Sequence, residues 1–205
     1  ASAALIGAYD QLSSFDTEGL YMPIMADIMG EDLMINSVDN WNWFVTVYQM
    51  NVLPNYTYVE VPWSQAYKVI YDANSIIDNA NFIPDATEDQ KNKLIGEAKV
   101  IRAFMMLKLT EMYAPAYASD PNALSILNAN MAVSAESEDF PRATNVEIYD
   151  QIESDLLSAI NLLGNYSDKG FFDKRAAQAV LARAYLNKGA YEQAKDMAKL
   201  AHEGL

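Results

Sequence analysis

The chain has 205 residues, of which 51% are hydrophobic, and its formal net charge at pH 7 is −14. This length and composition are sufficient for a substantial core, and we expect residues 1–205 to form a single domain. No cluster of Lys and Arg interrupts the acidic background, so the chain is not expected to bind nucleic acid or an anionic membrane surface. It contains no cysteine, which excludes disulfides, thiolate nucleophiles and cysteine-based metal sites.

Three segments in the first half of the chain show helical periodicity. Apolar residues recur every three or four positions over residues 2–12 and 18–28. Pro23 falls near the start of the second segment, where a missing N–H costs least. Pro62 is suited to the first position of a third helix, which we expect to end near Asn79.

Two stretches lack this periodicity. Residues 30–60 are rich in Asn, Asp and aromatic residues, and we expect a loop there that contains a short helix near residues 43–47. Residues 114–143 are rich in Pro, Ser, Asn and acidic residues, which predicts a long irregular connection. Such loops are uncommon in compact domains, so this one is either functional or packed along the surface.

Two capping boxes mark the starts of further helices. Thr87 is followed at the third position by Gln90, and Thr144 by Glu147, so each pair can satisfy backbone donors at a helix start. The helices predicted from these boxes span residues 88–113 and 145–163.

The last part of the chain has the pattern of a tetratricopeptide unit. Four residues match its eighth, eleventh, twentieth and twenty-seventh positions. They are Ala182, Tyr185, Ala194 and Ala201. Small residues let two antiparallel helices approach closely, and Gly189 permits the turn between them. The pattern departs at Gln178 and Ala198, where aromatic residues are usual.

Four segments of the chain, at residues 62–78, 96–114, 141–163 and 173–194, resemble in this order the SusD/RagB family of surface glycan-binding lipoproteins of Bacteroidetes. The most informative segment resembles the family's Gly-Glu-Ala, Arg-Ala and aromatic-Leu pattern, and it is GEAKVIRAFMMLKLTEMYA at 96–114. The others are PWSQAYKVIYDANSIID at 62–78, PRATNVEIYDQIESDLLSAINLL at 141–163 and DKRAAQAVLARAYLNKGAYEQA at 173–194.

The resemblance implies both a fold and a function. The fold would be all-α, with tetratricopeptide-like helical hairpins and long irregular loops, and the chain would be the N-terminal part of a longer protein. The function would be glycan capture without catalysis, and delivery to a SusC-type TonB-dependent transporter. The protein would be a surface lipoprotein of the outer membrane, anchored through a lipidated Cys upstream of this sequence. The alternative is a tetratricopeptide scaffold that binds a protein and no sugar.

The aromatic loop, residues 37–51, carries the candidate ligand site. Sugars stack their C–H faces on indole rings and donate hydroxyl hydrogen bonds to amides, so the alternating residues Asn40, Trp41, Asn42 and Trp43 suit a glycan. The family resemblance also implies that a loop near this position contributes aromatic residues to the sugar site. The alternative is that Trp41 or Trp43 anchors the loop to the core.

Catalysis and metal binding find little support in the sequence. The only histidine is His202, which excludes a Ser-His-Asp triad and multi-histidine metal sites. Composition alone leaves a glycosidase carboxylate pair open, because acidic residues cluster in two places. These are Asp27, Glu31, Asp32 and Asp39, and then Glu136, Glu138 and Asp139. We expect both clusters to be solvated loops, and we expect no catalytic residue, cofactor or metal.

Several other prominent residues are expected to be structural. Trp63 and Tyr67 share one helix face and should pack into the core. Three arginines are expected to form ion pairs between helices, with Glu97 or Asp155 as possible partners. They are Arg102, Arg142 and Arg183.

Overall fold

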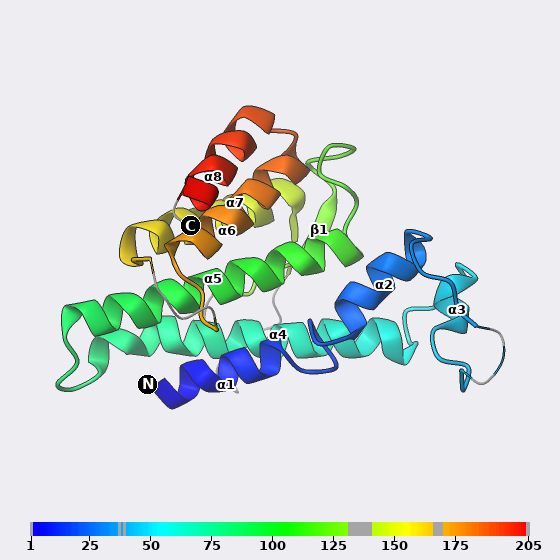
Figure 1. The fold of residues 1–205 in the computed structure, drawn as a ribbon, viewed down its shortest axis with the longest axis horizontal. Coiled ribbons are helices and arrows are strands. Elements are labelled where there is room, and N and C mark those ends of the chain that lie inside the picture. Colours follow the sequence, from blue (N-terminus) through cyan, green and yellow to red (C-terminus); the bar gives the residue numbers. More distant parts are fainter. Residues whose placement is uncertain (1, 37, 39, 131–140, 166–169, 204–205) are drawn as a thin grey trace.

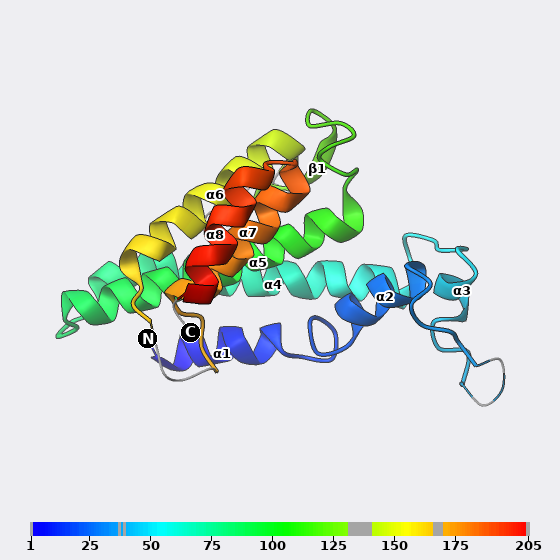
Figure 2. The same ribbon diagram turned by 45° about the horizontal axis from the view of Figure 1, so that its top comes forward.

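The computed structural model describes residues 2–36, 38, 40–130, 141–165 and 170–203. Their elements are α1 (Ser2–Leu12), α2 (Tyr21–Met29), α3 (Val45–Tyr48), α4 (Thr57–Asn79), η1 (Ala80–Phe82), α5 (Glu88–Tyr113), β1 (Leu124–Leu127), β2 (Arg142–Thr144), α6 (Asn145–Leu162), α7 (Lys174–Lys188) and α8 (Tyr191–Glu203). The long helices α4 and α5 lie side by side, with α1 on one flank and α6 to α8 on the other (Figures 1 and 2). The predicted all-α, tetratricopeptide-like fold is confirmed.

Helix α5 is the centre of the bundle because it is packed on several sides. It contacts α1, α4, α6 and α7. Ile101, Met105 and Leu109 are fully buried on one face of the helix. On the adjacent faces Val100, Met106 and Leu107 are fully buried as well. The predicted capping box starts this helix: Thr87 Oγ1 accepts from Gln90 N, and Gln90 Oε1 accepts from Thr87 N.

A glycine sets the distance between α5 and α6. A Cβ added to Gly96 would lie 2.6 Å from Cδ2 of Leu163 at the end of α6, so this crossing has no room for a side chain. The second capping box, Thr144 with Glu147, starts α6 as predicted. The sequence therefore determines two features of this helix pair. The Thr144–Glu147 box sets where α6 begins, and Gly96 sets how closely α5 and α6 approach.

A buried ion pair joins α5 and α6. Arg102 donates from Nε to Asp155 Oδ2 at 2.7 Å and from Nη2 to Oδ1 at 2.6 Å. Its Nη1 donates to Asn74 Oδ1 of α4 at 2.8 Å. Asp155 is thus the partner of Arg102, as anticipated, whereas Glu97 accepts a bond from the Tyr9 hydroxyl of α1 at 2.7 Å.

The predictions for the other two arginines had different outcomes. Arg183 of α7 forms a two-bond ion pair with Glu111 of α5, as expected for a residue that ties helices together. The expectation for Arg142 was wrong. Its guanidinium donates to the backbone carbonyls of Ser125 at 2.6 Å and Leu124 at 3.3 Å, and so clamps the neighbouring strand.

The last two helices form the predicted hairpin. Gly189 caps α7 with φ of 76°, in the left-handed region that glycine tolerates. Ala194 is the buried residue of α8, and Ala184 and Tyr185 are buried on α7. Tyr185 and Lys188 also donate to Glu153, at 2.8 and 2.9 Å, which fixes the hairpin to α6.

Two helix starts differ from the predictions. Helix α4 begins at Thr57, five residues before Pro62, because Tyr58 stacks on Phe44 with ring centroids 4.3 Å apart and so holds an extra turn in place. In that turn the Val59 carbonyl accepts from the Tyr113 hydroxyl at 2.8 Å. Helix α2 begins at Tyr21 and not near residue 18, because the chain first doubles back on the end of α1.

The connection between α5 and α6 is more regular than predicted. Strands β1 and β2 pair antiparallel, with Leu124 opposite Thr144 and Leu127 opposite Arg142. Tyr67 fixes this ribbon to α4, because its hydroxyl donates to the Leu127 carbonyl at 3.2 Å and accepts from the Leu127 N–H at 2.8 Å. The described part of this segment therefore packs along the surface, which is one of the two outcomes anticipated for it.

Candidate ligand-binding site

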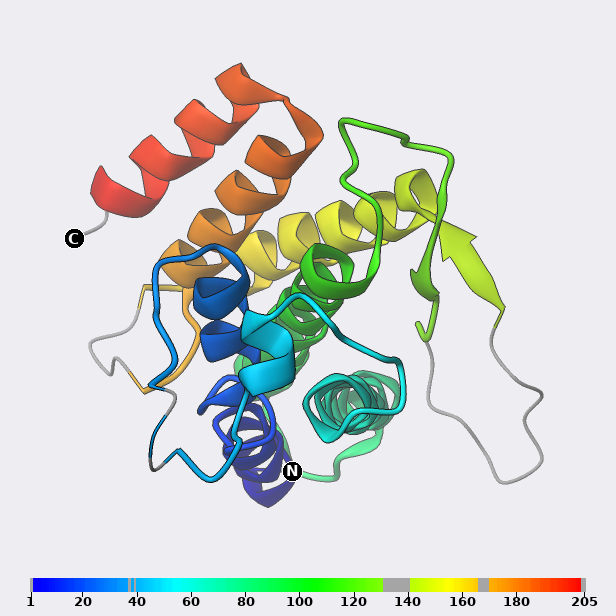
Figure 3. The same cartoon turned by 90° about the vertical axis from the view of Figure 1, so that its right-hand side faces the viewer.

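The aromatic loop lies beyond α2 at one end of the molecule, around α3 (Figure 1), and this end faces the viewer in Figure 3. Its tip is a tight turn in which Trp43 N donates to the Asn40 carbonyl at 2.9 Å. The Asn40 side chain supports this turn, since its Oδ1 accepts from Asn42 N at 2.9 Å. The two central residues have positive φ, 53° at Trp41 and 59° at Asn42. This conformation is costly for a bulky residue such as Trp41.

The turn leaves one indole in solvent and the other half covered. Trp41 is 90% exposed, so its ring does not anchor the loop to the core. Trp43 is 47% exposed and packs edge-on against Phe15 and Phe44, with centroid distances of 6.0 and 6.3 Å. Both indoles therefore offer surface to a ligand, although Trp43 also has a packing role.

The two asparagines contribute amide groups beside the indoles. Asn42 is exposed, whereas Asn40 is partly buried. The Asn40 Nδ2 group is covered and finds no hydrogen-bond partner among the described residues. A buried donor of this kind is satisfied by water or by a bound group. The four predicted residues are thus brought together in one turn. The exposed side chain of Asn42 lies in that turn next to the open indole of Trp41.

A small second core holds this turn in position. Its buried residues are Tyr21, Met25, Ile28, Phe44 and Val47. Phe44 stacks on Tyr58 and lies edge-on to Tyr21 at 5.8 Å, while Phe15 contacts both Tyr21 and Trp43. These supporting aromatic residues come from segments far apart in the sequence and were not predicted. Their aromatic character was the only available signal.

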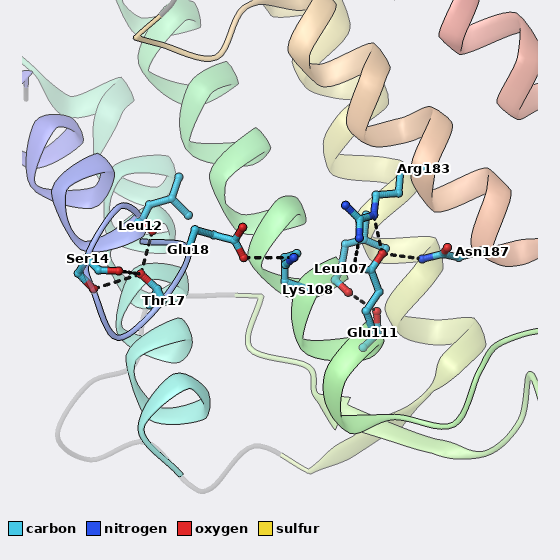
Figure 4. Close-up of polar contacts among 10 residues, drawn as sticks. Leu12, Ser14, Thr17, Glu18, Leu107, Lys108, Glu111, Arg183 and Asn187 are labelled. Atoms are coloured by element: carbon cyan, nitrogen blue, oxygen red, sulfur yellow. Dashed lines mark hydrogen bonds and ion pairs between the residues drawn. The ribbon is translucent and has the colours of Figure 1, made fainter. Parts of the chain in front are cut away.

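Polar contacts fix the base of the same end against α5. Thr17 Oγ1 donates toward the carbonyls of Gln11 and Leu12 at 2.7 and 2.8 Å, which closes the turn between α1 and α2. From that turn Glu18 reaches Lys108 Nζ of α5 at 3.4 Å (Figure 4). Because Lys108 is itself nearly buried, this ion pair ties the aromatic end to the bundle.

The remaining candidates lie apart from this turn. Trp63 and Tyr67 pack against the core as predicted, and burial raises the pKa of the Tyr67 hydroxyl. His202 is exposed near the end of α8. The second acidic cluster, with Asp39 of the first, lies outside the described residues. Within the described part of the chain, no three acidic or histidine side chains gather in a way that could hold a metal ion.

A hollow of about 640 Å³ is lined by residues outside the aromatic loop. It lies between the start of α1, the segment after η1 and the first turns of α5. Its lining includes Ile6, Ile83, Lys93 and Phe171, and is mostly aliphatic. Neither indole contributes to it, so it gives no support to the predicted site.

The helical-hairpin fold and the exposed aromatic turn define a class of helical modules, and comparison with known proteins identifies the family. Residues 6–186 match the family model SusD-like_3, described as "Starch-binding associating with outer membrane". The chain therefore belongs to the SusD-like family. Among its described helices, none is long and apolar enough to cross a membrane.

Individual relatives agree with this assignment. A SusD-like protein of Bacteroides ovatus is 27% identical over 155 residues, which cover 74% of this chain and 26% of the relative. A SusD-like carbohydrate-binding protein of Bacteroides vulgatus is 25% identical, with a TM-score of 0.86 over 98% of this chain and 43% of that one. A laminarin-binding SusD-like protein shares the fold, with a TM-score of 0.78, 22% identity and coverage of 96% and 41%. The chain thus spans about a quarter of the curated relatives' length and less than half of the solved chains.

Proposed function

We propose that this chain captures a glycan at the cell surface, without catalysing its cleavage, as part of a SusD-like lipoprotein. The observation that carries the proposal is the turn at 40–43. It holds Trp41 90% exposed on an aromatic base in a chain whose family is described as starch-binding. An exposed indole in a strained backbone conformation costs free energy in the isolated chain, and ligand binding is the function that offsets such a cost.

The geometry supports a simple binding mechanism. A sugar ring stacks its C–H face on the open indole of Trp41, while the exposed edge of Trp43 limits where the next ring can lie. The exposed amide of Asn42 bonds to hydroxyls beside the stacked ring, while Asn40 holds the turn through its bond from Asn42 N. The turn is closed by its own hydrogen bonds and rests on Phe44, so little conformational entropy is lost when the ligand binds.

The cellular part of the proposal rests on the family. In this proposal the chain belongs to the helical part of a lipid-anchored outer-membrane protein, and the captured glycan passes to a SusC-type TonB-dependent transporter. The family's described association with the outer membrane supports the location. The relatives' greater length supports a role for further residues in completing the site.

Glycan titration tests the capture step. We expect this chain to bind soluble starch or laminarin oligosaccharides weakly, with a Kd no tighter than about 1 mM, which corresponds to about −4 kcal/mol. Trp41→Ala should weaken binding by at least about tenfold. Phe82→Ala is the matched control, because Phe82 is an equally open aromatic residue, 81% exposed, near the other end of α4. Parental affinity in both Trp41→Ala and Trp43→Ala, with both variants folded, would remove the proposed site.

The second candidate is a scaffold that binds a protein and no sugar. The same end of the molecule exposes aliphatic side chains that suit a protein contact better than a sugar. They include Met34, at 84%, and Val38, at 61%. The titration separates the two functions, since a scaffold would show no saturable glycan binding at any concentration. The substitution Met34→Ser should weaken the scaffold's contact with a protein partner and leave glycan binding unchanged.

A further inference from the structure

A second, smaller hollow lies where the last turn of α5 meets α6 and α7. It encloses about 310 Å³, close to the lower limit of about 300 Å³ for small-molecule sites. We call it the tyrosine pocket, and its lining residues are Thr110, Glu111, Ala114, Pro115, Ala116, Tyr117, Tyr149 and Asn187. None of them belongs to the aromatic loop.

Two tyrosines form its apolar surface. The rings of Tyr117 and Tyr149 meet edge to face, with centroids 5.0 Å apart. Tyr149 is 4% exposed, whereas Tyr117 is only partly buried and offers ring surface to the pocket. Lys188 lies 5.9 Å from the Tyr117 centroid and steadies that ring through a cation–π contact. Burial raises the pKa of the Tyr149 hydroxyl above its ordinary value.

The side chains of Glu111 and Asn187 form the polar side of the pocket, and Arg183, which is not part of the lining, holds Glu111 in place. Glu111 accepts two bonds from Arg183, both at 2.7 Å, and one from Asn187 Nδ2 at 2.9 Å (Figure 4). Exposed ion pairs of this type contribute little stability, and Arg183 is half exposed. Their structural effect is orientation. The carboxylate and the amide are held side by side, and Nη1 of Arg183 makes no hydrogen bond within the described residues.

We infer that the tyrosine pocket is a saccharide-binding subsite that takes one neutral sugar unit. Its volume suits a single ring, the Tyr117 face suits the C–H surface of that ring, and the oriented groups of Glu111 and Asn187 suit a pair of neighbouring hydroxyls. The Arg183 charge balances that of Glu111, so the pocket has no excess cationic charge that would select a phosphate or a carboxylate. This site does not require the aromatic loop to bind sugar.

The position of the pocket also suits a longer glycan. Lys108 and Glu111 are one turn apart on α5, and they face Glu18 and Arg183 respectively. Met112 of the same turn packs against both the main core and the small core beneath the aromatic loop. The tyrosine pocket and the aromatic loop thus flank the same end of α5, which faces the viewer in Figure 3.

The test is an NMR titration of the protein with maltoheptaose and with laminarihexaose, followed at the backbone amides of Ala114, Ala116, Tyr117 and Asn187. We expect saturable shifts there. In both Tyr117→Ala and Asn187→Ala the Kd measured at these amides should rise by at least about tenfold. Tyr191→Ala is the matched control, since Tyr191 is 68% exposed on α8 and lies outside the pocket. Circular dichroism checks the fold, and Asn187→Ala carries the test if Tyr117→Ala does not fold.

The outcomes distinguish this site from the aromatic loop. Shifts at the pocket that persist in Trp41→Ala support the subsite even if the loop itself binds nothing. Shifts confined to the loop, no shift with either oligosaccharide, or pocket shifts unchanged by both substitutions would overturn it.

Discussion

The middle of α5 and the aromatic loop place side chains in opposite ways. Around Arg102, side chains from α4, α5 and α6 are buried and hydrogen-bonded to one another, and the backbone is regular helix. At Trp41, a large apolar side chain projects into solvent from a backbone with positive φ. The first region shows what the sequence needs in order to fold. The second shows a feature that folding does not require, and this is where function is expected.

The largest loss of stability is expected from a substitution that breaks the buried Arg102–Asp155 ion pair. In Arg102→Ala, Asp155 would lose both of its short hydrogen bonds while buried, and Asn74 would lose one. Truncating one partner of a buried pair costs about 3–5 kcal/mol. Chemical denaturation should therefore show a large fall in the free energy of unfolding.

Arg183→Ala is the matched control for this substitution. It removes the same kind of two-bond ion pair at a half-exposed position, so the cost should be at most about 1 kcal/mol. Equal losses in the two variants would show that burial does not distinguish these pairs, contrary to the structure.

Substitutions at two glycines, Gly96 and Gly7, should change stability by an intermediate amount. In Gly96→Ala the new methyl group would meet Leu163 at 2.6 Å, and overpacking of this kind costs about 1–3 kcal/mol. In Gly7→Ala the new Cβ of α1 meets nothing within 4 Å, and the better helix propensity should stabilise by about 0.5–1 kcal/mol. Thermal unfolding of both variants measures the difference, and a shift of the same sign in both would contradict the close α5–α6 crossing.

Most of the bundle was predictable because local and tertiary preferences agree there. The two capping boxes and Gly189 each predict a structure that packing then reinforces. Pro62 shows the opposite case. It suits a first helical position, yet the stacking of Tyr58 on Phe44 extends the helix by a turn before it. The sequence alone does not reveal such a contact between distant residues.

The ribbon and the site show two other limits of local sequence patterns. Strands β1 and β2 have four and three residues, too few for an alternating pattern to predict them. Without the strands, the sequence favours a charged partner for Arg142, whereas its guanidinium donates to strand carbonyls. The candidate residues of the aromatic loop could be chosen by chemistry. Whether each indole faces solvent or core depends on Phe15, Phe44 and Tyr58, which three separate segments bring together.

The smallest change in stability is expected at Trp41, and it tests the contrast between the buried bundle and the aromatic loop. Because Trp41 buries almost none of its side chain, Trp41→Ala should change the free energy of unfolding by no more than about 0.5 kcal/mol, as for other exposed substitutions. Phe44→Ala, three residues along, removes a ring that is 3% exposed and stacked on Tyr58, and should cost about 3–5 kcal/mol. Both positions have positive φ, 53° and 55°, so the backbone strain is matched and the difference isolates side-chain burial. Denaturant titration measures both values. A large loss in Trp41→Ala would mean that the indole stabilises the fold, and any loss of glycan binding in that variant would then have a structural cause.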